Sequence, residues 1–341
     1  MRGGPSRALL RSVIYLLLAC LLMLAGSAAY ASQSLSSMPS AALSRQPAKS
    51  AGPLPSATPA PPVTTVLAAS AFDQLRSDLE TIATRSGAAR VGISLQELSG
   101  PRRNTLSMNG NASFIAASAY KVPLLMAEAQ RIVSGQASGS DVLCFDPDDA
   151  EDGWFDDYDV GSCFTRDELS LRTGRYSDNT AAHILVRYLG GADALNAYAK
   201  SIGMTASVLW VPNTTTPDDL TAAWVNEALG RLGGAAAWQW LFPLLTHTAN
   251  EYGIPAGLPA GATVVHKVGT LDGMENDSAY IVNGRASYVL TVAVDGIDEN
   301  LGWSLISQIS GRIWQYEAGR PDYVTPVAAT PVAPSARPNR H

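Results

Sequence analysis

Two residues three positions apart could form a nucleophile and its base. Ser118 and Lys121 lie in the sequence Ser-Ala-Tyr-Lys, between small and apolar residues. A serine hydroxyl needs a neighbouring base to act as a nucleophile, and residues three apart on a helix share a face. Burial among apolar groups lowers the pKa of a lysine, so Lys121 could be neutral and accept the proton of Ser118. The pair predicts nucleophilic serine chemistry, although Ser-x-x-Lys alone also recurs by chance on surface helices.

Two further motifs follow in the chain. Ser-Asp-Asn at residues 177–179 opens an apolar helical run, and His-Lys-Val-Gly-Thr at residues 266–270 ends an alternating apolar stretch. Ser-x-x-Lys, Ser-Asp-Asn and Lys-Thr-Gly are the motif set of class A β-lactamases and penicillin-binding proteins. Because order, spacing and flanking pattern agree, the chain resembles the class A β-lactamases over about residues 70–317.

The resemblance implies a role for each catalytic residue. Ser118 would attack a carbonyl and form an acyl-enzyme, and Lys121 would take its proton directly or through water. Ser177 would pass a proton to the leaving nitrogen. Lys267 would support Ser177 and attract a carboxylate of the substrate. A cleft with two lysines favours anionic, carboxylate-bearing amides.

The resemblance also implies a set of substrate-binding groups. Asn179 would hydrogen-bond the side-chain amide of the substrate, and Gly269 would let the substrate approach the strand edge. The backbone N–H groups of Ser118 and Thr270 would form the oxyanion hole. Asp178 is expected to be structural, and neither a cofactor nor a metal ion is implied.

Two departures from the family pattern affect the expected chemistry. Val268 replaces the usual hydroxyl residue after the lysine, so a hydrogen bond to the substrate carboxylate is lost unless Thr270 compensates. The loop that carries the deacylating glutamate in class A enzymes corresponds to residues 203–217, which contain no acid. Asp218 and Asp219 are better explained as the start of a helix. We therefore expect complete acylation machinery and slow deacylation.

Three functions are compatible with these residues. The first is an exported serine hydrolase that acylates Ser118 with β-lactams or related amides and hydrolyses them slowly. The second is a D,D-peptidase acting on peptidoglycan peptides, which manages without the loop glutamate. The third is a sensor or scaffold that binds a β-lactam or peptidoglycan covalently and stays acylated. A Ser-His-Asp hydrolase is disfavoured, because Gly-x-Ser-x-Gly does not occur.

Composition and the chain ends indicate an exported protein. Residues 1–31 combine three arginines, an apolar stretch and an Ala-Tyr-Ala site, which predicts a cleaved signal peptide. The alternative is a membrane anchor through residues 13–29. Removing the three arginines lowers the formal net charge from −6 to −9, which argues against nucleic-acid binding. We expect a monomer whose partner is a small β-lactam or a peptidoglycan peptide.

Pro-, Ser- and Ala-rich stretches flank the predicted domain. Residues 32–67 are expected to be a disordered linker and residues 320–341 a disordered tail, which leaves residues 68–319 as the hydrolase domain. Helical periodicity dominates the middle of that domain, including a helix at 235–247, whereas strands are predicted near both of its ends. This order predicts an α+β fold in which an antiparallel sheet is flanked by helices and joined to an all-helical lobe.

An acidic segment lies between Cys144 and Cys163. These are the only cysteines left after signal removal, and an exported chain favours their pairing. The acids between them do not match the EF-hand ligand spacing. They are better explained as a solvated flap pinned by a disulfide than as a calcium site. His183 and His266 are expected to be packed and structural.

Overall fold

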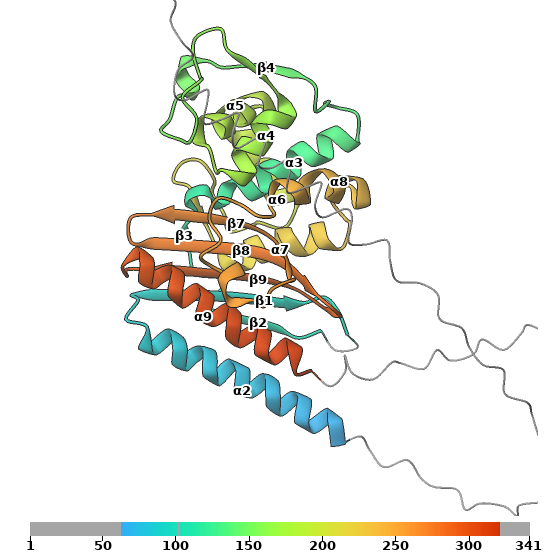
Figure 1. Ribbon diagram of the computed structural model, residues 1–341, viewed down its shortest axis with the longest axis vertical. Helices are drawn as coiled ribbons and strands as arrows, with labels where there is room; N and C mark the ends of the chain where they lie inside the picture. The colour runs from blue at the N-terminus through green and yellow to red at the C-terminus, as the bar shows by residue number, and fades with distance from the viewer. Residues whose placement is uncertain (1–62, 101–102, 321–341) are drawn as a thin grey trace, which may run out of the picture. The chain divides into compact units, whose positions relative to one another are not determined.

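An antiparallel sheet of five strands, in the order β2-β1-β9-β8-β7, is the centre of the computed structural model, which describes residues 63–100 and 103–320 (Figure 1). The strands come from both ends of this part of the chain, so the predicted α+β class is confirmed. Successive side chains along each strand point to opposite faces of the sheet, and helices cover both faces. The strand bounds are β1 Arg90–Glu97, β2 Thr105–Met108, β7 Thr263–Leu271, β8 Met274–Asn283 and β9 Ala286–Asp295.

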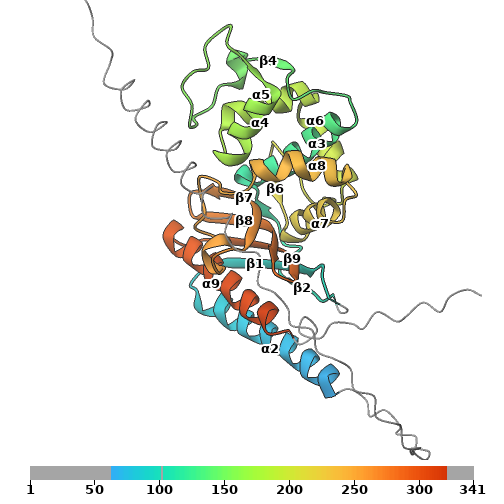
Figure 2. The ribbon, with the colours of Figure 1, turned by 45° about the vertical axis from the view of Figure 1, so that its right-hand side comes forward.

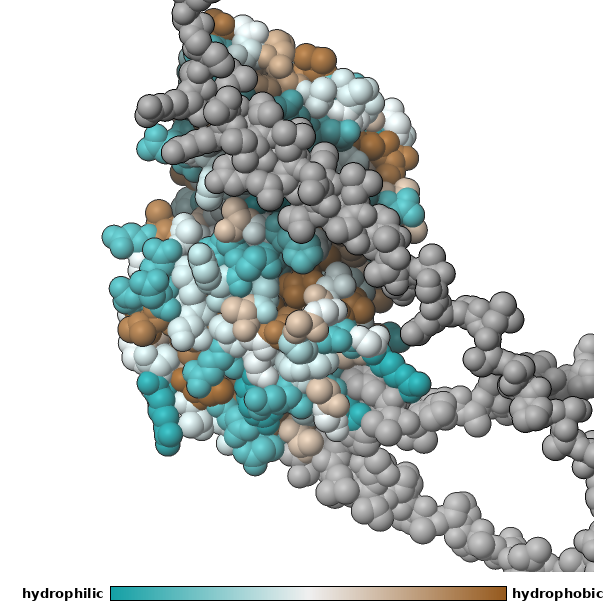
Figure 3. Space-filling view, in the orientation of Figure 1, coloured by the Kyte–Doolittle hydropathy of each residue, from teal (hydrophilic) through white to brown (hydrophobic). Residues whose placement is uncertain are grey.

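Helices α2 (Val63–Arg85) and α9 (Glu299–Ala318) lie side by side on one face of the sheet (Figures 1 and 2). Leu75 and Leu79 recur four residues apart and are fully buried in the core under these helices, together with Ile306 of α9. The surface over α2 and α9 is mostly hydrophilic or intermediate in hydropathy, with isolated hydrophobic residues (Figure 3).

Both predicted limits of the domain need correction. Helix α2 begins at Val63, inside the stretch that we expected to be linker, so the folded domain starts earlier than its composition indicated. Arg320, expected to start the tail, is buried and forms ion pairs with Glu97 and Glu317. Buried carboxylates need such a partner. The signal, the anchor alternative and the rest of the linker and tail lie outside the described residues.

The helical lobe follows the first two strands and packs around its own hydrophobic core. Helix α7 joins it to the second face of the sheet, and Figure 2 shows the other helices gathered beyond β7. The expected all-helical lobe is therefore present. Its helices are α3 Lys121–Val133, α4 Arg166–Arg175, α5 Asn179–Leu189, α6 Gly191–Ser201, α7 Pro217–Ala228 and α8 Gly234–Leu241.

Several short elements complete the fold. Four 3₁₀ turns lie within the described residues: η1 Ala117–Tyr120, η2 Pro147–Asp149, η3 Phe242–Leu244 and η4 Pro255–Gly257. The helix predicted for residues 235–247 is wrong at its end, because Pro243 has no N–H to donate and the chain continues as the 3₁₀ turn η3. Among the described residues, no helix is long and apolar enough to cross a bilayer.

Two short strand pairs lie outside the main sheet. Strand β3 (Phe114–Ile115) pairs with β6 (Thr214–Thr215), and β4 (Val142–Cys144) pairs with β5 (Cys163–Thr165). Cys144 faces Cys163 across the second pair, and the two form the predicted disulfide. The acidic segment 145–162 is therefore closed at its base.

Two acids of this segment bind arginines of the helical lobe. Asp149 forms an ion pair with Arg187 at 2.7 Å, and Asp157 with Arg172 at 2.6 Å. In the described part of the chain, no group of three or more potential ligands is placed to hold a metal ion. The acids thus attach the segment to α4 and α5, which corrects the view of it as only a solvated flap.

Candidate active site

Ser118 lies in the 3₁₀ turn η1, directly before helix α3. A 3₁₀ turn places residue i over residue i+3. Lys121 therefore lies next to Ser118, and its Nζ is 3.0 Å from Ser118 Oγ, as the spacing of the motif predicts. The hydroxyl and the amine are thus in hydrogen-bond contact before any substrate binds.

The other contacts of Lys121 direct its amine toward the serine. Lys121 Nζ donates to Asn179 Oδ1 and to the backbone oxygen of Ser177, both at 2.6 Å. Both of these oxygen atoms can only accept hydrogen bonds. A neutral amine has two N–H groups and one lone pair, so these two contacts use both donors. The lone pair is then left for the hydroxyl proton of Ser118.

Both lysines of the site have lowered pKa values. Lys121 is fully buried, and this burial lowers its pKa to about 7 although Asp178 and Glu151 oppose the change. Burial also lowers the pKa of Lys267 well below its ordinary value, and repulsion from Lys121 adds to this. A lysine with a pKa near 7 can act as a general base at neutral pH.

Ser177 connects the two lysines. Its Oγ accepts from Lys267 Nζ at 2.8 Å and lies 3.3 Å from Lys121 Nζ. Ser177 has a φ of 58°, which few non-glycine residues adopt. Asp178 stabilises this backbone: it is fully buried and caps α5 by accepting from the N–H of Ala181. This contact is the structural role expected for Asp178.

Gly269 was expected to let the substrate approach the strand edge. Glycine is also needed here for a contact within the protein itself. A Cβ at this position would lie 2.4 Å from the backbone oxygen of Ala116 and 3.2 Å from the backbone nitrogen of Ser118. Glycine therefore lets edge strand β7 pack against the turn that holds the nucleophile. Thr270 follows on the same strand and is exposed.

A pocket of about 540 Å³ opens beside Ser118. It brings Ser118, Asn179 and Thr270 together with three residues that the sequence did not assign to the site: Glu151, His183 and Trp210. The remaining lining residues are Ile115, Ala117, Tyr120, Pro212, Asn213 and Leu271.

His183 is more than the packed residue that its apolar helix suggested. It lies four residues after Asn179 on α5, and this spacing was the available signal that both face the same way. His183 Nε2 lies 2.7 Å from Glu151 Oε2, and its ring packs on Trp210 with centroids 4.5 Å apart. Trp154, Phe155 and Tyr158, three aromatic residues of the acidic segment, do not line the pocket.

The loop at 203–217, which has no acid, contributes Trp210, Pro212 and Asn213 to the lining of the pocket. Asn213 accepts from the N–H of Ala116 and donates to the backbone oxygen of Ala117, so it holds the residues before Ser118. The backbone N–H of Asp219 donates to Thr216 Oγ1, and its carboxylate accepts from Ser207. The carboxylate of Asp218 accepts from Ser107. Neither acid lines the pocket.

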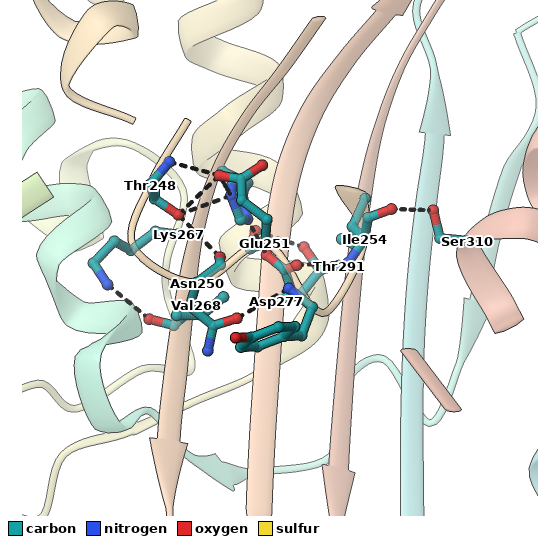
Figure 4. Close-up of polar contacts among 12 residues, drawn as sticks. Thr248, Asn250, Glu251, Ile254, Lys267, Val268, Asp277, Thr291 and Ser310 are labelled. Carbon is teal, nitrogen blue, oxygen red and sulfur yellow. Dashed lines mark hydrogen bonds and ion pairs between the residues drawn. The ribbon is translucent and has the colours of Figure 1, made fainter. Parts of the chain in front are cut away.

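His266 faces a buried acidic cluster behind Lys267. Its ring lies 2.9 Å from Asp277 and 3.1 Å from Glu251. Burial opposes protonation, but Asp277 and Glu251 raise the pKa of His266 to about 9. Figure 4 shows Thr248, Glu251 and Asp277 in this network, with Lys267 on β7, the strand that also carries His266. His266 and Lys267 point to different partners, since Lys267 contacts Ser177.

Val268 lies in the core between the sheet and α2 and α9. Its side chain is only 7% exposed, so it packs rather than lines the pocket. Its backbone oxygen accepts from Lys267 Nζ at 2.9 Å (Figure 4). Among the residues of the third motif, Thr270 is the one with a side chain at the pocket.

The sequence is similar to curated β-lactamases. CTX-M-8 of Citrobacter amalonaticus is 29% identical over 231 residues, which cover 60% of this chain and 76% of that protein. OXY-2 of Klebsiella oxytoca is 28% identical over 61% of this chain and 77% of its own length. CTX-M-25 of Escherichia coli is 35% identical over 38% of this chain, and the match spans only half of its length.

Solved structures agree with this similarity. The structure of PBP-A has a TM-score of 0.67 and 26% identity, covering 71% of this chain and 95% of that one. An ancestral class A β-lactamase has a TM-score of 0.65 and 29% identity, covering 71% and 99%. Residues 74–317 match the model of the beta-lactamase enzyme family. The chain therefore belongs to the class A β-lactamase family.

Proposed function

We propose that this protein is an exported serine hydrolase that forms an acyl-enzyme on Ser118 with β-lactams or related carboxylate-bearing amides. The observation that carries the proposal is the contact chain Ser118–Lys121–Ser177–Lys267, in which two buried lysines have lowered pKa values. Nucleophilic catalysis by serine requires an adjacent base of this kind.

Acylation follows from these contacts. Ser118 Oγ gives its proton to Lys121 Nζ and bonds to the substrate carbonyl carbon, while the N–H groups of Ser118 and Thr270 stabilise the oxyanion. As the C–N bond breaks, the hydroxyl of Ser177 gives its proton to the leaving nitrogen. Ser177 recovers a proton from Lys121, 3.3 Å away. Lys267 holds Ser177 and attracts the substrate carboxylate, and Asn179 binds the amide side chain.

Deacylation is proposed to be the slower step. Residues 203–217 carry no acid, so the usual loop glutamate is absent. The acyl-enzyme should therefore accumulate during turnover. The same proposal includes export directed by residues 1–31, a monomeric state and a small-molecule partner. The hydrolase would then act on the extracytoplasmic side.

A D,D-peptidase is the second candidate. It is favoured by the missing loop acid and by the structural similarity to PBP-A, a mutant of which has been solved as an acyl-enzyme complex with penicillin G. Both functions use the same acylation step and differ in the bond that is cleaved.

Two product assays distinguish the functions. With benzylpenicillin, a hydrolase with slow deacylation opens one equivalent of β-lactam ring rapidly per enzyme, followed by a slow steady state. Release of D-alanine from a peptide ending in D-Ala-D-Ala, faster than that steady state, would favour the peptidase. One equivalent with no later turnover in either assay would indicate a covalent binder, and no acylation by either compound would refute the proposal.

A further inference from the structure

Glu151 brings a carboxylate into the pocket from the disulfide-closed segment 145–162. It lines the pocket together with Ser118 and Asn179. Its Oε1 lies 3.5 Å from Asn179 Nδ2, and Oδ1 of the same asparagine binds Lys121 Nζ. An acid therefore lines the pocket that holds the nucleophile, although the loop at 203–217 has none.

The position of Glu151 is fixed by three residues from the first turns of α5. Its backbone N–H donates to Thr180 Oγ1 at 3.0 Å, and the same hydroxyl donates to its backbone oxygen at 2.8 Å. Asn179 and His183 contact the two carboxylate oxygens. Thr180 is buried, so this attachment is shielded from water. Catalytic groups must be held in this way to act efficiently.

His183 holds one carboxylate oxygen and leaves the other at the pocket. Its Nε2 lies 2.7 Å from Glu151 Oε2, and its ring is held against Trp210. Glu151 remains half exposed, with 49% of its side chain accessible, so water can reach the carboxylate. This combination of a fixed position and access to water is what a general base for hydrolysis requires.

We propose that Glu151 is the catalytic base for deacylation and that His183 is its positioning residue. Glu151 takes a proton from water as the water oxygen bonds to the acyl carbon. The intermediate then collapses, the bond between that carbon and Ser118 Oγ breaks, and Ser118 recovers a proton, which returns Glu151 to its carboxylate form. This inference rests on the proposed function and assigns the step that the missing loop acid leaves open.

The test separates acylation from deacylation in the full chain. Wild type and Glu151→Gln are mixed with benzylpenicillin, the excess drug is removed, and the adduct is followed by intact-mass spectrometry. General bases contribute about 100- to 10,000-fold. Glu151→Gln should thus acylate within about threefold of wild type, while its adduct decays at least about 100-fold more slowly. Asp156→Asn, at an exposed acid of the same segment, should match wild type.

The role of His183 is tested by combining its substitution with that of Glu151, in addition to the single substitution. His183→Gln should slow decay of the adduct, and the double variant with Glu151→Gln should be no slower than Glu151→Gln by itself. Decay of the Glu151→Gln adduct at the wild-type rate would overturn the proposal. An equal loss of acylation and deacylation rates in Glu151→Gln would also overturn it, because this would indicate that Glu151 serves to place Asn179. Failure of wild type to form any adduct would refute the proposed function itself.

Discussion

The pKa of Lys121 predicts how the acylation of Ser118 depends on pH. Burial lowers this pKa to about 7, against the opposing effect of Asp178 and Glu151. About half of the Lys121 side chains are then neutral at pH 7, about a tenth at pH 6 and about nine tenths at pH 8. An ordinary lysine would be neutral in only about 0.04% of molecules at pH 7.

Acylation should therefore accelerate with pH in proportion to the neutral form of Lys121. The rate constant for adduct formation with benzylpenicillin should rise about tenfold from pH 6 to pH 8 and level off above that. Because Lys121 and Lys267 repel each other, the apparent pKa describes the coupled pair. Quenched-flow sampling with intact-mass detection from pH 5.5 to 9 would measure this profile.

Lys121→Arg provides the decisive comparison. A guanidinium stays protonated at every pH of the experiment and cannot accept the proton. The variant should lose at least about 100-fold in acylation rate and should show no rise between pH 6 and 8. Lys200→Arg, at an exposed lysine of α6, is the matched control and should behave as wild type. A flat wild-type profile, or normal acylation by Lys121→Arg, would refute Lys121 as the base.

Three further predictions concern packing, charge and the disulfide. Gly269→Ala should slow acylation at least about tenfold, because its Cβ would overlap the backbone before Ser118; unchanged kinetics would contradict this contact. The raised pKa of His266 should stabilise the fold fully below about pH 6.5, and about 3 kcal/mol should be lost as pH rises through about 9. Urea unfolding at pH 6 and 9.5 would show it, and a His266→Gln variant with the same pH dependence would contradict it. Replacing Cys144 and Cys163 by alanine should lower the free energy of unfolding by about 3 kcal/mol. It should also slow deacylation more than acylation, and equal effects on both rates would show that the disulfide does not position Glu151.

Features set by local chemistry could be predicted from the sequence. Asp218 and Asp219 were expected to start a helix, and the helix begins at Pro217. Its cap is Thr216, whose hydroxyl accepts from the N–H of Asp219. Ser118 and Lys121 were expected to touch because three residues are one turn, and they do. In both cases the interacting groups lie within four residues, so the spacing alone determines the geometry.

The Glu151 contact could not be predicted in this way. Glu151 lies in an irregular segment whose path depends on the disulfide and on Thr180, which is 29 residues away in the chain. Hydrophobic periodicity describes helices and strands and carries no information on such a loop. The same limit explains why the short pair β3–β6 was missed, since two-residue strands show no alternation.

The end of the edge strand also could not be predicted from the side-chain pattern. The alternating apolar stretch before the third motif indicates a strand, but it does not show that β7 continues to Leu271. Apolar alternation stops at Gly269, but the backbone keeps pairing with β8 through Thr270 and Leu271. The extension brings Thr270 to the pocket. Sheet pairing thus decided the position of a site residue where side-chain pattern gave no signal.

The central claim is that Ser118 is the nucleophile, and locating the acyl group tests it most directly. The full chain is mixed with benzylpenicillin, quenched in acid within seconds, digested and mapped by tandem mass spectrometry. The account predicts one penicilloyl group on the peptide that contains Ser118, and none in a folded Ser118→Ala variant. An adduct on another residue, or undiminished labelling of Ser118→Ala, would contradict it.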